Sequence, residues 1–226
     1  MQPLRTSITN NPITITGGLR SGAPSPLVYI LDDDEGVRTS LSWLVGSVGL
    51  RAITYGAAAE FLRSFNPDQP ACLILDVRMP EIGGFEVQEF LHQTGAHIPV
   101  VFVSAHGDIP MTVRAMKNGA FDFIEKPYNS QQLLERIQEA VRVAAVRFDA
   151  RQHRMALAQR LSHLSPREHE VLRLVVQGKT SKLIAAQLNI TAKTVDIHRA
   201  SIREKLGVSS LAELVSEMLT HHEPLP

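Results

Sequence analysis

Acidic residues, a hydroxyl and a lysine stand at the ends of short apolar runs in this sequence. The run Asp32–Asp34 follows LVYIL, and Asp76 follows ACLIL. Ser104 follows PVVFV, and Lys126 comes shortly after FDFI. Clustered carboxylates ionise together at low cost only beside a cation, and oxygen ligands in a partly hydrated site favour Mg²⁺. A nearby hydroxyl and ammonium could hold the oxygens of a phosphoryl group attached to a carboxylate.

These residues can act together only if the apolar runs are strands of one sheet. Five such runs occur, at residues 27–31, 50–54, 71–75, 99–103 and 121–124. Segments with apolar residues at helical spacing alternate with them, which predicts a doubly wound α/β fold with helices on both faces of a parallel sheet. In the flavodoxin-like strand order 2-1-3-4-5, Asp33 and Asp76 converge at the carboxyl edge, where ligands bind in such folds.

A second, all-α domain is predicted in the last third of the chain. Ser165 and Glu168, three residues apart, form a capping box at the start of a helix. A short helix over 182–188 is followed by a break at Asn189 and a longer helix over 191–206. With a last short helix, this pattern describes a small four-helix domain of the helix-turn-helix type.

The longer helix over 191–206 is predicted to enter the major groove of DNA. The residues on its outward face that could reach base edges or nearby phosphates are Lys193, Asp196, Ile197, Ala200 and Arg203. The flanking residues suited to backbone contacts are Lys179, Lys182, Thr191, Thr194 and Arg199. Ile197 and Ala200 can contact thymine methyl groups, whereas Asp196 can accept a hydrogen bond from cytosine but repels phosphate.

Composition and charge favour two globular domains with different tasks. The 226 residues are 44% hydrophobic and 20% charged, with a formal net charge of zero. Acidic residues outnumber basic ones over 1–130, and basic residues outnumber acidic ones over 179–205. No apolar run approaches the roughly 20 residues that span a bilayer. The single cysteine, Cys72, excludes an intrachain disulfide and makes a cytoplasmic location the simplest expectation.

Several motifs, in order along the chain, resemble a two-component response regulator of the FixJ/NarL group. They are LDDDE at 31–35, LDVRMP at 75–80, VSAHGDIPMTVRAMKNGAFDFIEKPY at 103–128 and the terminal helix-turn-helix. Proteins of this group join a phosphorylatable receiver domain to a LuxR-type DNA-binding domain. With the patterns above, the expected organisation is a disordered extension over 1–26, a receiver over 27–142, a helical linker over 143–160 and a DNA-binding domain over 161–226.

The resemblance implies roles for individual residues of the receiver. Asp76 matches the phosphoacceptor, and Ser104 and Lys126 match the residues that contact its phosphoryl group. The residues that change conformation on activation correspond to Ser104, Phe123 and Tyr128. The implied protein ligands of Mg²⁺ are Asp33, Asp76, the backbone carbonyl of Arg78 and, through water, Asp32.

The function is therefore expected to be that of a transcription regulator, not an enzyme. In this hypothesis a sensor histidine kinase phosphorylates Asp76, and the protein then dimerises through a face near residues 109–140. It binds promoter DNA and acts with RNA polymerase. A second hypothesis makes Asp32 and Asp34 the nucleophile and acid of a haloacid-dehalogenase-type phosphatase, although the later acidic motif of that family is missing. A regulator that works without phosphorylation is a third possibility.

Overall fold

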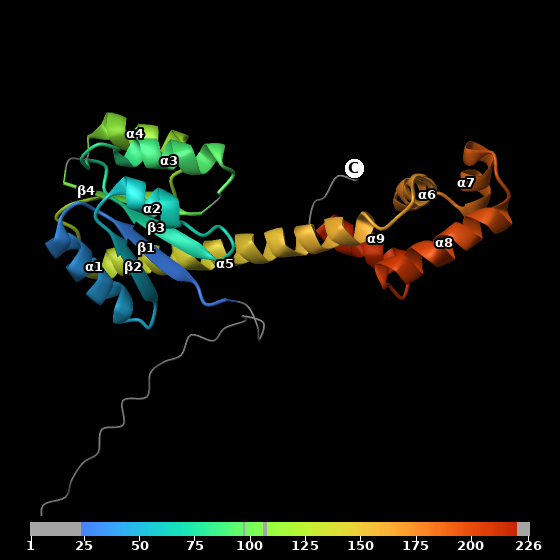
Figure 1. The fold of residues 1–226 in the computed structure, drawn as a ribbon, viewed down its shortest axis with the longest axis horizontal. Helices are drawn as coiled ribbons and strands as arrows, with labels where there is room; N and C mark the ends of the chain where they lie inside the picture. Colours follow the sequence, from blue (N-terminus) through green and yellow to red (C-terminus); the bar gives the residue numbers. More distant parts are fainter. Residues whose placement is uncertain (1–23, 97, 106–107, 221–226) are drawn as a thin grey trace, which may run out of the picture. The chain divides into compact units, whose positions relative to one another are not determined.

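The computed structural model describes residues 24–96, 98–105 and 108–220 (Figure 1). The contacts within the chain divide it near residue 147 into an N-terminal unit and a C-terminal unit. The extension expected over 1–26 falls almost entirely outside the described residues. None of the described helices has the length and apolar character needed to cross a lipid bilayer.

The N-terminal unit is built on one parallel sheet. Its strands are β1 (Leu27–Leu31), β2 (Arg51–Tyr55), β3 (Ala71–Leu75), β4 (Val100–Ser104) and β5 (Asp122–Glu125). Their spatial order is β2-β1-β3-β4-β5, and every neighbouring pair is parallel. The predicted flavodoxin-like order is therefore confirmed, with three strands beginning one residue later than the sequence pattern indicated.

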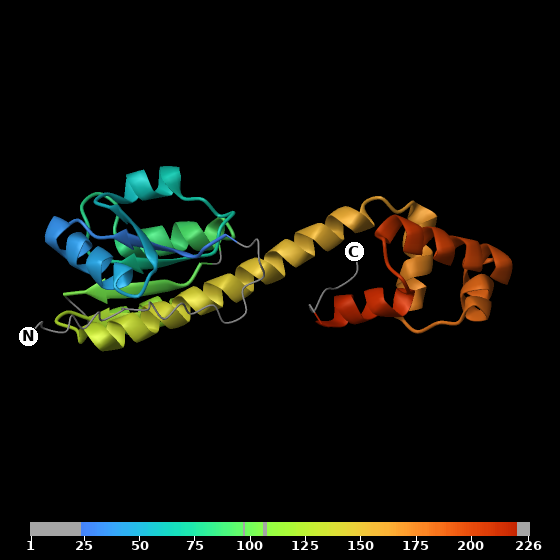
Figure 2. The same cartoon turned by 90° about the horizontal axis from the view of Figure 1, so that it is seen from below.

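Helices cover both faces of this sheet (Figures 1 and 2). One face packs against α2 (Ala58–Ser64), α3 (Gly84–Gln93) and α4 (Ile109–Lys117). The other packs against α1 (Glu35–Gly46) and the first part of α5 (Ser130–Leu161). Side chains alternate between the two faces along each strand, and both sets are buried in the central strands β1, β3 and β4.

The edge strands are less buried than their apolar sequences suggest. Short apolar runs such as the one over 50–54 predict strands buried on both faces, but most residues of β2 are half-buried or exposed. This prediction is wrong because β2 lies at the edge of the sheet and has one neighbour. Cys72, by contrast, is fully buried in the central strand β3, and burial raises the pKa of its thiol to about 12.

Gly84, the first residue of α3, packs closely against the loop that carries Asp76. A Cβ atom at Gly84 would lie 2.3 Å from the carbonyl oxygen of Asp76. Gly84→Ala is therefore expected to push α3 away from this loop and to lower the free energy of unfolding by about 1–3 kcal/mol. Chemical denaturation measures this change.

Gly46→Ala is the matched control, because nothing lies within 4 Å of a Cβ at that position in α1. It should be neutral or stabilising by up to about 1 kcal/mol. Equal stability of the two variants would contradict the steric argument for Gly84.

The C-terminal unit is helical. After the end of α5 it contains α6 (Pro166–Val176), α7 (Ser181–Leu188), α8 (Ala192–Leu206) and α9 (Leu211–Thr220). The predicted end signals are confirmed, because Ser165 and Glu168 form a capping box and Asn189 ends α7 in the left-handed conformation. The side chain of Thr191 caps α8. The tight connection between α7 and α8 is the turn of the predicted helix-turn-helix.

The predicted linker over 143–160 lies within α5, a single helix of 32 residues. Ala144, at its start, is buried in the N-terminal unit, whereas Leu157 and Leu161 belong to the core of the C-terminal unit. The ends of α5 are thus parts of the two cores, and the division near residue 147 falls inside this helix.

Candidate functional site

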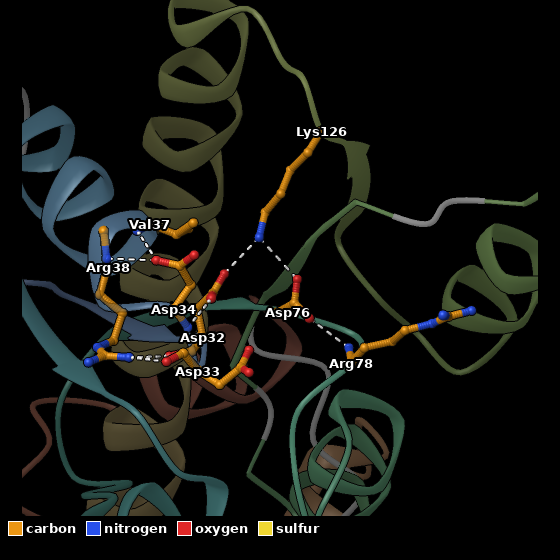
Figure 3. A network of polar contacts seen from close by, with 9 residues as sticks. Asp32, Asp33, Asp34, Val37, Arg38, Asp76, Arg78 and Lys126 are labelled. Carbon is orange, nitrogen blue, oxygen red and sulfur yellow. Dashed lines mark hydrogen bonds and ion pairs between the residues drawn. The ribbon is translucent and has the colours of Figure 1, made fainter.

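Two buried carboxylates and a lysine meet at the carboxyl edge of the sheet (Figure 3). Asp32 follows β1, Asp76 follows β3, and Lys126 follows β5. The Nζ atom of Lys126 lies 2.8 Å from Oδ2 of Asp32 and 3.1 Å from Oδ1 of Asp76. Asp32 and Asp76 are only 3% and 7% exposed. The parallel order of the strands therefore brings together three of the predicted site residues from distant parts of the chain.

Burial sets the protonation behaviour of this cluster. It raises the pKa of Asp76 above the ordinary value for aspartate, although hydrogen bonds from Lys126 and the backbone of Arg78 partly offset the shift. Burial alone would lower the pKa of Lys126, but the bonds to Asp32 and Asp76 outweigh it, and the pKa is raised. Lys126 therefore stays positively charged at neutral pH, beside a carboxylate that has lost much of its hydration.

The loop after β1 gives its three aspartates different environments. Oδ1 of Asp32 accepts a hydrogen bond from the backbone N–H of Asp34 at 2.9 Å. Oδ1 of Asp34 accepts from the N–H groups of Gly36 at 2.7 Å and Val37 at 3.1 Å, and so caps α1. Asp33 is exposed, and Figure 3 shows its carboxylate pointing toward the side of the site where Asp76 lies.

The donor atoms at this edge suit a hard divalent cation. Asp32, Asp33 and Asp76 offer carboxylate oxygens, and Arg78 adds a backbone carbonyl, all of the type that Mg²⁺ prefers. Oδ2 of Asp76 accepts a 2.6 Å hydrogen bond from the backbone N–H of Arg78, which fixes the two residues together. Within the described residues, no three His, Cys, Asp or Glu side chains already form a metal cage. The residues thus fit Mg²⁺ by donor type, and Lys126 bridges two of them.

The residues predicted to change on activation lie at the end of β4, in β5 and in the segment after β5. Ser104 is buried at the end of β4, and its carbonyl oxygen accepts a 2.8 Å hydrogen bond from the backbone N–H of Lys126. Phe123 is half-buried in β5, with its ring centroid 6.0 Å from that of Phe102. Tyr128 is half-buried, and burial raises the pKa of its hydroxyl. These positions connect the carboxyl edge to β4 and β5.

The second candidate site is the outward face of α8. Val195, Ile202 and Leu206 are buried, whereas Ile197 is 60% exposed. Among the predicted DNA-contacting residues, Thr194 and Arg199 are half-buried. The exposed ones are Lys179, Lys182, Thr191, Lys193, Asp196, Ile197, Ala200 and Arg203. Apart from the two half-buried residues, this set is accessible to a ligand of the C-terminal unit.

Hydrogen bonds of three residues, Ser181, Glu168 and Arg38, could not be anticipated from the sequence. Ser181 Oγ donates a 2.8 Å hydrogen bond to Oδ1 of Asp196, so this aspartate is held across the turn between α7 and α8. Glu168 also accepts hydrogen bonds from Ser201 and Lys205 of α8, each at 2.7 Å. Arg38 of α1 donates to two carbonyl oxygens of the acidic loop. No residue pattern in the sequence signals these pairings.

The fold and the two sites define a class of protein: an α/β domain with a carboxylate–lysine cluster, joined to a helix-turn-helix domain. Residues 28–138 match the family model of the response regulator receiver domain. Residues 162–218 match that of the bacterial regulatory proteins of the luxR family.

Full-length relatives share both domains. The response regulator protein TodT of Pseudomonas putida is 43% identical over 189 residues, which cover 84% of this chain and 83% of TodT. The transcriptional regulatory protein FixJ of Azorhizobium caulinodans is 38% identical over 188 residues, 83% of this chain and 89% of FixJ. The solved structure of the response regulator StyR is 44% identical, with a TM-score of 0.76, covering 87% of this chain and 100% of StyR.

The chain therefore belongs to the response regulators that carry a LuxR-type DNA-binding domain. The comparisons give no support to the haloacid-dehalogenase-type phosphatase hypothesis. The geometry also weighs against it, because the Asp34 carboxylate caps α1 by accepting hydrogen bonds from the backbone N–H groups of Gly36 and Val37.

Proposed function

We propose that this transcription regulator is controlled by phosphorylation of Asp76 by a sensor histidine kinase. The observation that carries the proposal is the Lys126 ammonium, which lies within 3.1 Å of the buried Asp76 carboxylate at the carboxyl edge of the sheet. A fixed cation beside a partly desolvated carboxylate is suited to stabilising negative charge that arrives with a phosphoryl group.

The proposed role of each residue is the one that the resemblance to response regulators implies, placed at the position that the residue has in the fold. An oxygen of Asp76 attacks the phosphorus of the kinase's phosphohistidine, the nitrogen–phosphorus bond breaks, and its electron pair returns to the imidazole. Lys126 exchanges its contact with Asp76 for one with a phosphoryl oxygen, and Ser104 at the end of β4 donates its hydroxyl to another. Asp33, Asp76, the carbonyl of Arg78 and, through water, Asp32 would hold Mg²⁺, which would neutralise charge on the transferring group.

The test is to find which carboxylate becomes phosphorylated. The protein is incubated with a small phosphodonor or a phosphorylated sensor kinase in the presence of Mg²⁺, and the acyl phosphate is located by mass spectrometry. We expect it on Asp76. Modification of Asp32 would favour the phosphatase hypothesis. An unmodified chain that binds its promoter tightly would favour a regulator that works without phosphorylation.

We propose that the active form is a dimer, assembled through α4 and neighbouring elements over residues 109–140. Phosphorylation can shift the equilibrium between monomer and dimer only if the phosphoryl group interacts differently with the inactive and active conformations. In this proposal Ser104 moves toward the phosphoryl group in the active conformation, and the Phe123 side chain enters the space that Ser104 vacates. The support for this face is an exposed apolar stripe on α4, where Ile109 is 81% exposed and Val113 and Met116 are also exposed.

Val113→Glu should therefore keep the phosphorylated protein monomeric, because each dimer would bury the added charge against a second copy. Sedimentation of phosphorylated protein measures the effect. Val146→Glu, at an exposed valine of α5 outside this face, is the matched control and should still dimerise. Dimerisation of Val113→Glu at the affinity of the unaltered protein would refute the assignment of this face.

We propose that the active dimer binds promoter DNA in the cytoplasm, where it acts with RNA polymerase. The exposed face of α8 supplies the base contacts, and Lys182 at the start of α7 supplies a phosphate contact. Lys182→Ala should weaken binding to all sequences similarly and reduce the slope of affinity against salt by about one unit.

Ile197→Ala should leave that slope unchanged and lower the preference for the operator by roughly 1–3 kcal/mol if a thymine contact is lost. Salt titrations of both variants on operator and scrambled DNA separate these effects. The proposed placement of α8 fails if Ile197→Ala weakens both DNAs equally while Lys182→Ala alters only specificity.

A further inference from the structure

Arg38 holds the backbone of the acidic loop from the side opposite the carboxylates of Asp32 and Asp33. Its Nη1 atom donates hydrogen bonds to the carbonyl oxygens of Asp32 at 2.8 Å and Asp33 at 2.9 Å (Figure 3). The side chain comes from the first part of α1 and is half-buried. One guanidinium nitrogen therefore fixes two successive residues whose side chains are candidate metal ligands.

The position of this guanidinium depends on Gly56, which follows β2. A Cβ atom at Gly56 would lie 3.2 Å from Nη1 and 3.4 Å from Cζ of Arg38. The backbone N–H of Asp32 donates to the carbonyl of Tyr55, the preceding residue, at 3.3 Å. The Arg38 head group thus packs between the acidic loop and the segment after β2, in space that a side chain at position 56 would crowd.

We propose that Arg38 is a positioning residue of the divalent-cation site, which directs the Asp32 and Asp33 carboxylates and thereby raises the affinity for Mg²⁺. This inference rests on the proposed function. Residues that orient metal ligands through hydrogen bonds often change metal affinity by about 10–100-fold when they are removed. Without the hydrogen bonds from Arg38, the acidic loop would have to become ordered when Mg²⁺ binds. The conformational entropy lost in this ordering would lower the affinity for Mg²⁺.

The sign of the effect separates positioning from simple electrostatics. A guanidinium is a permanent positive charge and repels a divalent cation bound nearby. If Arg38 acted only through its charge, its removal would tighten Mg²⁺ binding. If it orients the carboxylates, its removal weakens Mg²⁺ binding.

The experiment titrates Mg²⁺ alone into the full chain by isothermal calorimetry. Arg38→Met, which keeps much of the side-chain length, should weaken Mg²⁺ binding about tenfold. Arg51→Met is the matched control: it removes the same charge from an exposed arginine at the opposite end of β2 and should leave the affinity unchanged. Phosphodonor labelling is a second readout, and at saturating Mg²⁺ the extent for Arg38→Met should match that of the unaltered chain.

Two further variants perturb the same contact more gently. Arg38→Lys retains the charge and one donor group, so its Mg²⁺ affinity should lie between those of Arg38→Met and the unaltered chain. Gly56→Ala leaves the arginine in place but displaces its head group, and should weaken Mg²⁺ binding in the same direction. These variants carry the test if Arg38→Met does not fold.

If the unaltered chain binds Mg²⁺ and Arg38→Met binds it equally or more tightly, the proposed role of Arg38 is wrong. The proposed function is not affected by this outcome. If Arg38→Met does not fold, unchanged affinity in both Arg38→Lys and Gly56→Ala would overturn it. Failure of the unaltered chain to bind Mg²⁺ would instead overturn the proposed metal site, and the role of Arg38 with it.

Discussion

Asp76→Asn is expected to reduce labelling by acetyl phosphate in the presence of Mg²⁺ to background. The variant keeps the size of the side chain and an oxygen that can accept from Lys126. It lacks a carboxylate oxygen able to form an acyl phosphate, so the reaction loses its nucleophile. Phosphate incorporated per chain is the measurement. Labelling at the stoichiometry of the unaltered protein would mean that another carboxylate accepts the phosphoryl group.

Asp33→Ala is the informative comparison for this variant. It removes an exposed carboxylate of the proposed metal site and leaves Asp76 in place, so labelling should fall because Mg²⁺ binds less tightly. Raising the Mg²⁺ concentration should partly rescue Asp33→Ala, but not Asp76→Asn. A failure of this rescue would remove Asp33 from the metal site while leaving the role of Asp76 intact.

Glu168→Ala is expected to destabilise the C-terminal unit by about 3 kcal/mol. Glu168 is 4% exposed and accepts hydrogen bonds from Ser201, Lys205 and the backbone N–H of Ser165, each at 2.7 Å. It therefore joins the start of α6 to α8, and its loss leaves several donors without their acceptor. Amide hydrogen exchange in α6 and α8 measures the change.

Glu170→Gln is a matched control on the same helix, because the Glu170 side chain is exposed and forms a surface ion pair with Arg167. Its effect should stay within about 0.5 kcal/mol. Equal protection of α8 in the control and in Glu168→Ala would contradict the bridging role.

The same carboxylate predicts a pH dependence. Burial alone would raise the pKa of Glu168, but the hydrogen bonds from Lys205, Ser165 and Ser201 lower it from 4.5 to about 2. The folded state therefore favours the ionised form, and its stabilising effect is fully present above pH 4.5 and is lost as the pH falls toward 2. This contribution is about 3 kcal/mol. Glu168→Gln should flatten the acid limb of the stability curve, and an unaltered limb would refute the assignment.

The strands that position the site could be predicted because buried strands have a recognisable pattern of apolar residues in the sequence. Runs that are apolar at every position indicate central strands, and their carboxyl ends place Asp32, Asp76 and Lys126 at one edge. Burial failed as a guide for β2, since a sequence run does not reveal which strand lies at the edge. The inward and outward faces of α8 were predictable from helical spacing alone.

The contacts that refine the site were beyond sequence reasoning for a different reason. Arg38 donates to backbone carbonyl oxygens. Because every residue has a backbone carbonyl, the residue types in the sequence do not indicate which carbonyls an arginine will contact. The hydrogen bond between Ser181 and Asp196 depends on how α7 crosses α8. The capping box predicted one of the three hydrogen bonds that the Glu168 carboxylate accepts, but its partners on α8 lie 33 and 37 residues away.

The burial of Cys72 gives the protein a built-in reporter. A thiol reacts as its thiolate, and with a pKa of about 12 and no exposed surface Cys72 has neither charge nor access at neutral pH. As the only cysteine in the chain, it can be alkylated only when the central strand β3 is uncovered. The rate at which a thiol reagent modifies the protein therefore reports how readily the receiver sheet opens, and no engineered label is needed.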